Sequence, residues 1–140
     1  MRDFTIAAAT AVAVAFGLMG TSMAQQRIVI SSEWGDVKAE LVDNEATRAL
    51  VNMLPVTIAM RDHLRQEKTG DLPSPLPAVT RQTGFAKGTL GLWSADHFVI
   101  YYKEGSVPQP GIVILGQVRD DVSIFDRPGP VTIRIEAAAK

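Results

Sequence analysis

The chain has 140 residues, the length of one domain of ordinary size. Its 14 lysines and arginines nearly balance 15 aspartates and glutamates, so no basic excess neutralises phosphates and nucleic acid is not an expected partner. Cysteine is absent, which excludes disulfides, thiolate catalysis and sulfur-ligated metals.

The first 24 residues have the pattern of a secretory signal peptide. A positive Met1-Arg2 start precedes an uncharged apolar run over residues 4–19, and small residues stand at Ser22 and Ala24. We predict cleavage after Ala24, which makes this an exported bacterial protein, periplasmic or secreted and free of the membrane. The alternative is an uncleaved anchor, because the apolar stretch is about long enough to span a bilayer.

Residues 27–136 are predicted to form one domain. Apolar, β-branched and aromatic runs predict strands, whereas Asp43-Asn44 before apolar residues at helical spacing predicts a helix that Leu54-Pro55 ends. The expected strands cover residues 27–32, 37–41, 56–60, 88–93, 98–102, 111–118 and 131–136, and the helix covers residues 45–53. This content predicts a mainly β fold, a small closed antiparallel barrel with one short capping helix. The proline-marked segment 64–77 is expected to be an ordered loop with at most one short strand.

The hairpin over residues 88–102 is the expected wall of any pocket. Its second run, Phe98 to Tyr102, is apolar on both faces and must therefore be covered on both. Trp93 and His97 flank the turn between the two runs, and Tyr101 and Tyr102 are expected on opposite faces.

Two chemistries are considered and set aside. Ser94, Asp96 and His97 suggest a nucleophile, but they share one turn and no Gly-x-Ser-x-Gly elbow is present. His63 and His97 with nearby aspartates suggest a metal, but no ligand-spacing motif supports it. We therefore predict no catalytic residue, no metal site and no cofactor. Glu67-Lys68 is expected to form a structural ion pair or loop contacts.

The order of these segments resembles the cyclophilin-like fold. The resemblance is carried by the opening hairpin, the helix ending at Leu54-Pro55, and the segments Gly88–Trp93, Phe98–Tyr102 and Gly111–Val118. It is closer to a family of small bacterial cyclophilin-like proteins of undetermined function. The segments shared with that family are Asp43-Asn44, Ala46-Thr47, Leu54–Thr57, Glu67-Lys68 and Asp71–Pro73, and the likeness covers nearly all of residues 27–136.

True cyclophilins isomerise X-Pro bonds with an apolar proline pocket and an arginine that stabilises the twisted amide. By the resemblance, Arg61 is a counterpart of that arginine, but no Gln-Gly-Gly-Asp run follows it. Val99 stands where the pocket phenylalanine is expected, and Trp93 stands where an alanine leaves room. Because fold alone does not imply function, the resemblance implies the barrel and argues against efficient isomerase activity.

The sequence therefore predicts an exported barrel that binds a peptide or small-molecule ligand through Arg61, Trp93, His97 and Val99. One alternative is a divergent peptidyl-prolyl cis-trans isomerase that acts as a folding helper outside the cytoplasm. The other is a protein-interaction domain that recruits a partner to an exposed strand edge.

Overall fold

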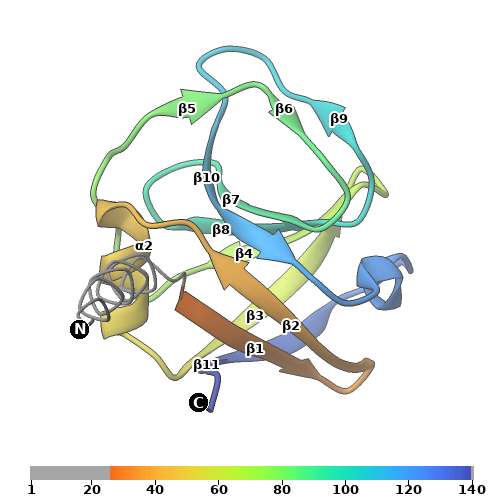
Figure 1. Cartoon of the computed structure of the whole chain (residues 1–140). Coiled ribbons are helices and arrows are strands. Elements are labelled where there is room, and N and C mark those ends of the chain that lie inside the picture. Colours follow the sequence, from red (N-terminus) through yellow and green to blue (C-terminus); the bar gives the residue numbers. More distant parts are fainter. Residues whose placement is uncertain (1–25, 140) are drawn as a thin grey trace, which may run out of the picture.

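The computed structural model describes residues 26–139, so the predicted signal segment lies outside the described residues. Its long sheet closes into an eight-stranded antiparallel barrel in the order β2-β1-β11-β3-β4-β8-β7-β10, with β10 pairing back to β2 (Figure 1). The barrel strands are β1 (Gln26–Ser32), β2 (Gly35–Leu41), β3 (Val56–His63), β4 (Glu67–Asp71), β7 (Thr89–Leu92), β8 (His97–Tyr101), β10 (Ile112–Val118) and β11 (Val131–Ala137). The prediction of a small closed barrel is confirmed.

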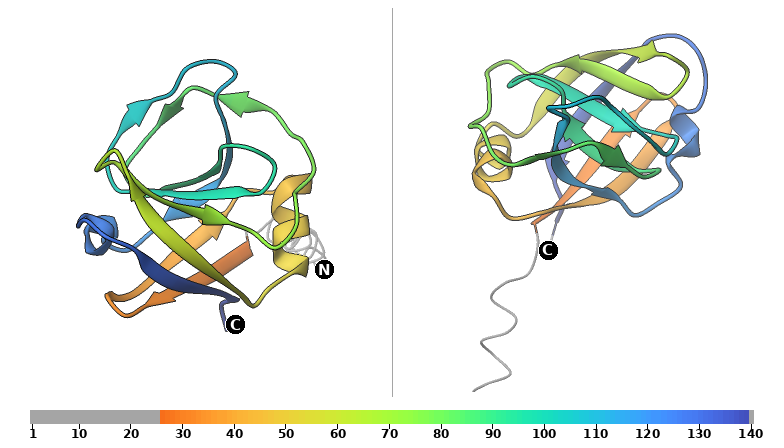
Figure 2. Two further views of the ribbon diagram at one scale, coloured as in Figure 1. Left: turned by 180° about the vertical axis from the view of Figure 1, so that it is seen from behind. Right: turned by 90° about the horizontal axis from the view of Figure 1, so that it is seen from above.

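The helix α2 (Glu45–Asn52) and the 3-10 helix η2 (Val122–Phe125) lie at opposite ends of the barrel (Figures 1 and 2). Asn44 begins α2 because its side chain accepts a hydrogen bond from the backbone N–H of Thr47, whose hydroxyl accepts one from Asn44 in return. The buried side chains of Ala46 and Leu50 then face the core. Within residues 26–139, no helix is both long and apolar enough to cross a membrane.

Closure of the barrel depends on Gly116. This residue pairs with Leu41 at the junction between β10 and β2, next to a register shift in the pairing of β10 with β7. A Cβ at Gly116 would lie 2.3 Å from the carbonyl oxygen of Glu40, closer than two such atoms can approach. Only glycine therefore lets the two strands meet here.

A second layer covers the outer face of β7, β8 and β10. It consists of β5 (Arg81–Gln82), which pairs with β10, and of the two-stranded sheet of β6 (Gly84–Phe85) and β9 (Gly105–Ser106), drawn above the barrel in Figure 1. The apolar cluster between the layers comprises Phe85, Val99, Tyr101, Val107 and Ile112. The expectation that the strand after the turn is covered on both faces is thus confirmed.

The segment over residues 64–77 contains one short strand, as the prediction allowed: Glu67–Asp71 forms the barrel strand β4 between β3 and β8. The turn before it passes through Leu64 and Arg65, whose φ angles are 56° and 50°. Such left-handed turns usually carry glycine or asparagine, so the residue types at this point do not indicate a hairpin.

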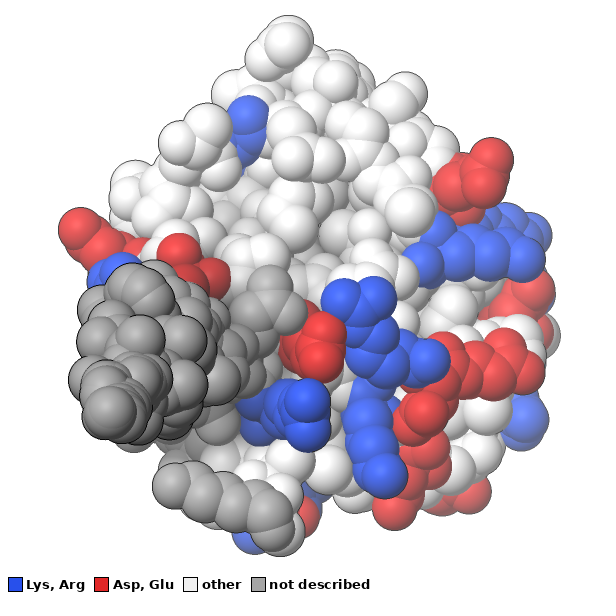
Figure 3. All heavy atoms as spheres, in the orientation of Figure 1, with Lys and Arg blue, Asp and Glu red and all other residues white. Residues whose placement is uncertain are grey.

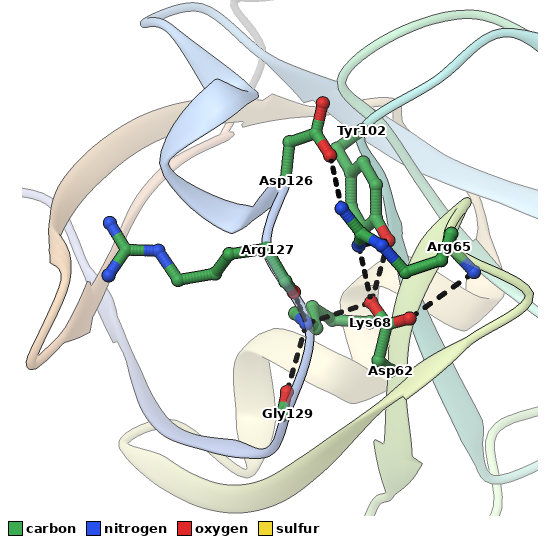
Figure 4. A network of polar contacts seen from close by, with 7 residues as sticks. All are labelled: Asp62, Arg65, Lys68, Tyr102, Asp126, Arg127 and Gly129. Atoms are coloured by element: carbon green, nitrogen blue, oxygen red, sulfur yellow. Dashed lines mark hydrogen bonds and ion pairs between the residues drawn. The ribbon is translucent and has the colours of Figure 1, made fainter.

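Lys68 lies inside one end of the barrel, fully buried. Its ammonium group donates to Asp62 Oδ1 at 2.8 Å, to the carbonyl of Gly129 at 2.9 Å and to the carbonyl of Arg127, which uses all three of its N–H donors (Figure 4). Tyr102 also donates to Asp62, at 2.6 Å. Together these bonds tie β3, β4 and Tyr102, the residue after β8, to the loop that precedes β11.

The same network shows that Glu67 and Lys68 do not pair with each other, whereas the predicted alternative of loop contacts is confirmed for Lys68, which bonds to the carbonyls of Arg127 and Gly129. As neighbours on a strand they point to opposite faces, so Lys68 faces the barrel interior and Glu67 faces outward. Asp62 has a pKa below its ordinary value: burial opposes ionisation, but hydrogen bonds from Lys68 and Tyr102 and the charges of Lys68 and Arg65 outweigh it.

Candidate functional site

The candidate site lies on the outer face of β3, β4 and β8. Cross-strand partners share a face, so the pairing of His63 with Glu67 and of Glu67 with Tyr101 forms one row of side chains. Two residues along the strands, the pairing of Arg61 with Thr69 and of Thr69 with Val99 forms the next row. Because side chains alternate between the two faces of a strand, these polar groups lie on the outer face, opposite the apolar core.

A cavity of about 400 Å³ opens at this face. Three of the four residues predicted to bind a ligand, Arg61, Trp93 and His97, line it together. Val99 lies on the same face but is fully buried, and it does not line the cavity. The other lining residues are His63, Glu67, Thr69 and Ser94. That these residues bind a ligand stays a prediction.

Glu67 is the functional candidate that the sequence did not single out. Its side chain is fully buried, yet it is a carboxylate, and such groups are buried only when they are paired. Oε1 accepts a hydrogen bond from Gln66 Nε2 at 2.8 Å, and Oε2 accepts one from the indole Nε1 of Trp93 at 3.0 Å. Two donors thus hold the carboxylate at the base of the cavity.

Trp93 is fixed at three points. Its backbone N–H donates to the carbonyl of His97 at 3.0 Å, its own carbonyl accepts from Arg81 Nη1 at 2.8 Å, and its indole donates to Glu67. The side chain therefore crosses from the turn beside His97 to the row of Glu67, and it packs against the cluster that contains Val99. This geometry makes Trp93 a rigid wall of the cavity.

Two polar atoms beside Glu67 are buried without a hydrogen-bond partner, the Nδ1 of His63 and the hydroxyl of Tyr101. His63 Nδ1 lies 3.6 Å from Glu67 Oε2, which is an ion-pair distance but too long for a hydrogen bond. Burial, and then the charge of Glu67, raise the pKa of Tyr101, so its hydroxyl stays protonated. The ring of Tyr101 stacks on Phe85 with centroids 3.7 Å apart.

The turn residues do not form a hydrolytic triad in the described part of the chain. Ser94 Oγ donates to Asp96 Oδ1 at 3.3 Å rather than to a histidine, and His97 Nδ1 lies 3.4 Å from Asp71 Oδ1. Among residues 26–139, no group of three or more histidines, aspartates or glutamates is arranged to hold a metal ion. His63 and His97 line the cavity from different strands.

Comparison with known proteins agrees with this architecture. No curated protein sequence matches the chain significantly. The solution structure of a hypothetical protein from Archaeoglobus fulgidus is similar, with a TM-score of 0.64 and 13% identity over 81% of this chain and 95% of that one. A cyclophilin-type peptidyl-prolyl cis-trans isomerase from Cryptosporidium parvum is also similar, with a TM-score of 0.57 and 17% identity over 83% of this chain and 99% of that one.

At these identities the two structures show a shared fold and nothing about activity. The family assignment comes from the sequence itself, because the model of the cyclophilin-like family matches residues 30–136. The chain therefore belongs to the cyclophilin-like family.

Proposed function

We propose that this chain is a binding protein that takes a peptide or small-molecule ligand in the cavity beside Trp93, without efficient isomerase activity. The observation that carries the proposal is the indole of Trp93, which Glu67 holds while His97 holds its backbone, as a fixed apolar wall next to a cavity of about 400 Å³. A cavity of this size suits a small ligand, and a preformed wall lowers the entropy cost of binding.

The arrangement also argues against a proline pocket. Trp93 packs against the cluster that contains Val99, which is fully buried and offers no surface to a proline ring. A buried carboxylate, Glu67, stands beside it. Isomerisation gains from an apolar pocket that holds the proline ring while the amide twists. A carboxylate at the base of the pocket disfavours burial of an apolar proline ring there.

Fluorescence titration tests the binding proposal. Because Trp93 lines the cavity and Trp34 packs against the core on the inner side, ligand binding should change the emission of Trp93. We expect at least one member of a panel of short peptides and small planar acids to shift the emission saturably. The same ligand should cause no shift in Trp93→Phe, which reports Trp34 alone. A panel without any saturable shift in the unaltered protein would contradict the proposal.

A divergent isomerase remains the second candidate function, because Arg61 lines the same cavity as Trp93. A protease-coupled assay on a chromogenic X-Pro peptide separates the two. We expect no acceleration above the uncatalysed rate, whose time constant is roughly 10–100 s. Turnover that disappears in Arg61→Ala would favour the isomerase. The interaction-domain hypothesis has less support at the barrel, where β2 and β10 pair and close the sheet, and would have to use the short strands β5, β6 or β9.

Export is proposed from the sequence of residues 1–24 alone. Mass spectrometry of the protein purified from its native host should find Gln25 as the first residue. Recovery of the chain with Met1 or Arg2 retained would contradict this.

A further inference from the structure

Arg61 has an unusual position among the arginines of this chain. Within residues 26–139 it is the only arginine with no hydrogen-bond, ion-pair or aromatic partner. The others are all engaged: Arg27 and Arg119 with Glu40, Arg48 with Asp43, Arg65 with Asp62 and Asp126, Arg134 with Glu136, Arg81 with two backbone carbonyls, and Arg127 over the ring of Trp34. The unpaired guanidinium is the one that lines the cavity.

Among the described residues, Glu67 is the only carboxylate that lines the cavity, and it already has other partners. Both of its oxygens accept hydrogen bonds, from Gln66 and Trp93. Arg61 therefore has a free positive charge at the wall of a cavity whose own carboxylate is used elsewhere.

A second group with spare hydrogen-bonding capacity lies on the same side. His63 follows Arg61 by two residues on β3, so both project from the outer face of that strand, about 7 Å apart along it. The buried Nδ1 of His63 has no hydrogen-bond partner, and its ring lines the cavity. Arg61, His63 and the indole of Trp93 thus surround one space with a cation, a polar ring and an apolar wall.

From this geometry we propose that the cavity recognises a carboxylate, with Arg61 binding the ligand's anionic group and Trp93 packing against its apolar body. The inference rests on the proposed binding function and specifies its ligand class. A guanidinium matches a carboxylate through two parallel N–H···O bonds, which gives orientation as well as attraction. One free cation beside the buried charge of Glu67 suits a single negative charge better than a dianionic phosphate.

A carboxylate of this kind is carried either by the C-terminus of a peptide or by a small aromatic acid. Two matched pairs of probes distinguish these sources and isolate the charge. One pair is N-acetylphenylalanine and its amide, and the other is the peptide Ala-Ala-Pro-Phe as free acid and as C-terminal amide. Within each pair only the carboxylate differs, so the ratio of the two dissociation constants measures its contribution.

Calorimetric titration at neutral pH tests the inference. We expect at least one free acid to bind about tenfold or more tightly than its amide, because charge-assisted hydrogen bonds are stronger than neutral ones. In Arg61→Gln the acid should bind no better than the amide, while the affinity for the amide stays the same. Arg134→Gln is the matched control, since Arg134 is an exposed arginine on β11 paired with Glu136. It should leave both affinities unchanged.

The outcomes separate this inference from the function on which it rests. Equal binding of acid and amide, or an acid preference that survives in Arg61→Gln, overturns the carboxylate inference and leaves the binding function standing. If no probe binds to protein with a folded circular dichroism spectrum, both proposals fail. A preference for the peptide acid alone assigns the carboxylate to a peptide C-terminus, and a preference for N-acetylphenylalanine as well extends it to small acids.

Discussion

The hydrogen bond between Trp93 and Glu67 should be a measurable part of the stability of the domain. Trp93→Phe keeps an aromatic wall but removes the N–H that lies 3.0 Å from Glu67 Oε2. It therefore leaves an oxygen of a fully buried carboxylate without its donor. Hydrogen bonds to charged groups contribute about 1.5–3 kcal/mol, so we expect the free energy of unfolding to fall by about 2–3 kcal/mol.

A double-mutant cycle isolates this bond from the lost indole surface. In the background of Glu67→Leu the carboxylate is gone, so Trp93→Phe should cost only about 1 kcal/mol, and the coupling energy between the two sites should be about 2 kcal/mol. Glu67→Gln keeps an acceptor without its charge and should retain about half of that coupling. Urea unfolding followed by far-UV circular dichroism measures all variants. A coupling energy below about 0.5 kcal/mol would refute the reasoning that Glu67 holds Trp93 in place.

Three further predictions concern the barrel. Leu64 is 76% exposed and has a φ of 56°, so Leu64→Asn should raise the free energy of unfolding by about 0.5–1 kcal/mol; a lower thermal midpoint would contradict this. Gly116→Ala should cost about 1–3 kcal/mol by urea unfolding, because its Cβ would lie 2.3 Å from a β2 carbonyl oxygen, whereas the control Gly84→Ala meets nothing within 4 Å. Asp62 has a lowered pKa, since its hydrogen bonds, including that from Lys68, outweigh the effect of burial. Its folded pKa lies below the unfolded value of 3.8, so its contribution to stability is present above that pH and is lost as pH falls through the folded pKa. Asp62→Asn should flatten this acid dependence in urea midpoints measured from about pH 5 to pH 2.

Most of the barrel could be predicted from the sequence because its strands follow simple rules. Alternation over residues 131–136 and the continuous apolar run over residues 111–118 correspond to β11 and β10 within a residue at each end. The helix predicted over residues 45–53 ends one residue earlier, at Asn52. In each case the burial pattern of the side chains is the one that the spacing of apolar residues requires.

The strand β4 could not be predicted in this way, for two physical reasons. Its first two residues, Glu67 and Lys68, carry charges that normally stay exposed, and both are fully buried on opposite faces. Partners from distant segments make this burial tolerable, namely Trp93 for Glu67, and Asp62 with the loop at Gly129 for Lys68. Such pairings exist only in the folded chain, so no local sequence pattern predicts them.

The candidate site likewise contains residues that the sequence predicts and one that it does not. Arg61, Trp93 and His97 were found because an arginine at a strand end, an aromatic and a histidine beside a turn are visible as residue types, and all three line the cavity. Glu67 was missed as a site residue because its role comes from the bond to Trp93 across the barrel surface. Surface charge gives little help in locating the site. The face drawn in Figure 3 mixes both signs over its lower half and is nearly uncharged over the β5–β6–β9 layer.

Ligand binding and the lack of efficient isomerase activity, the two parts of the proposed function, have one physical origin in the Glu67–Trp93 pair. A cyclophilin pocket needs open apolar surface for a proline ring beside its arginine, but here the indole packs against the cluster around Val99 and ends on a carboxylate. The hydrogen bond that places the indole also occupies Oε2 of Glu67, a residue that lines the cavity. Within residues 26–139, Arg61 has no counter-ion, and the wall beside it is the indole that Glu67 holds. An arginine in that setting is suited to hold an anionic group in place, whereas isomerisation requires it to follow an amide nitrogen as the bond twists.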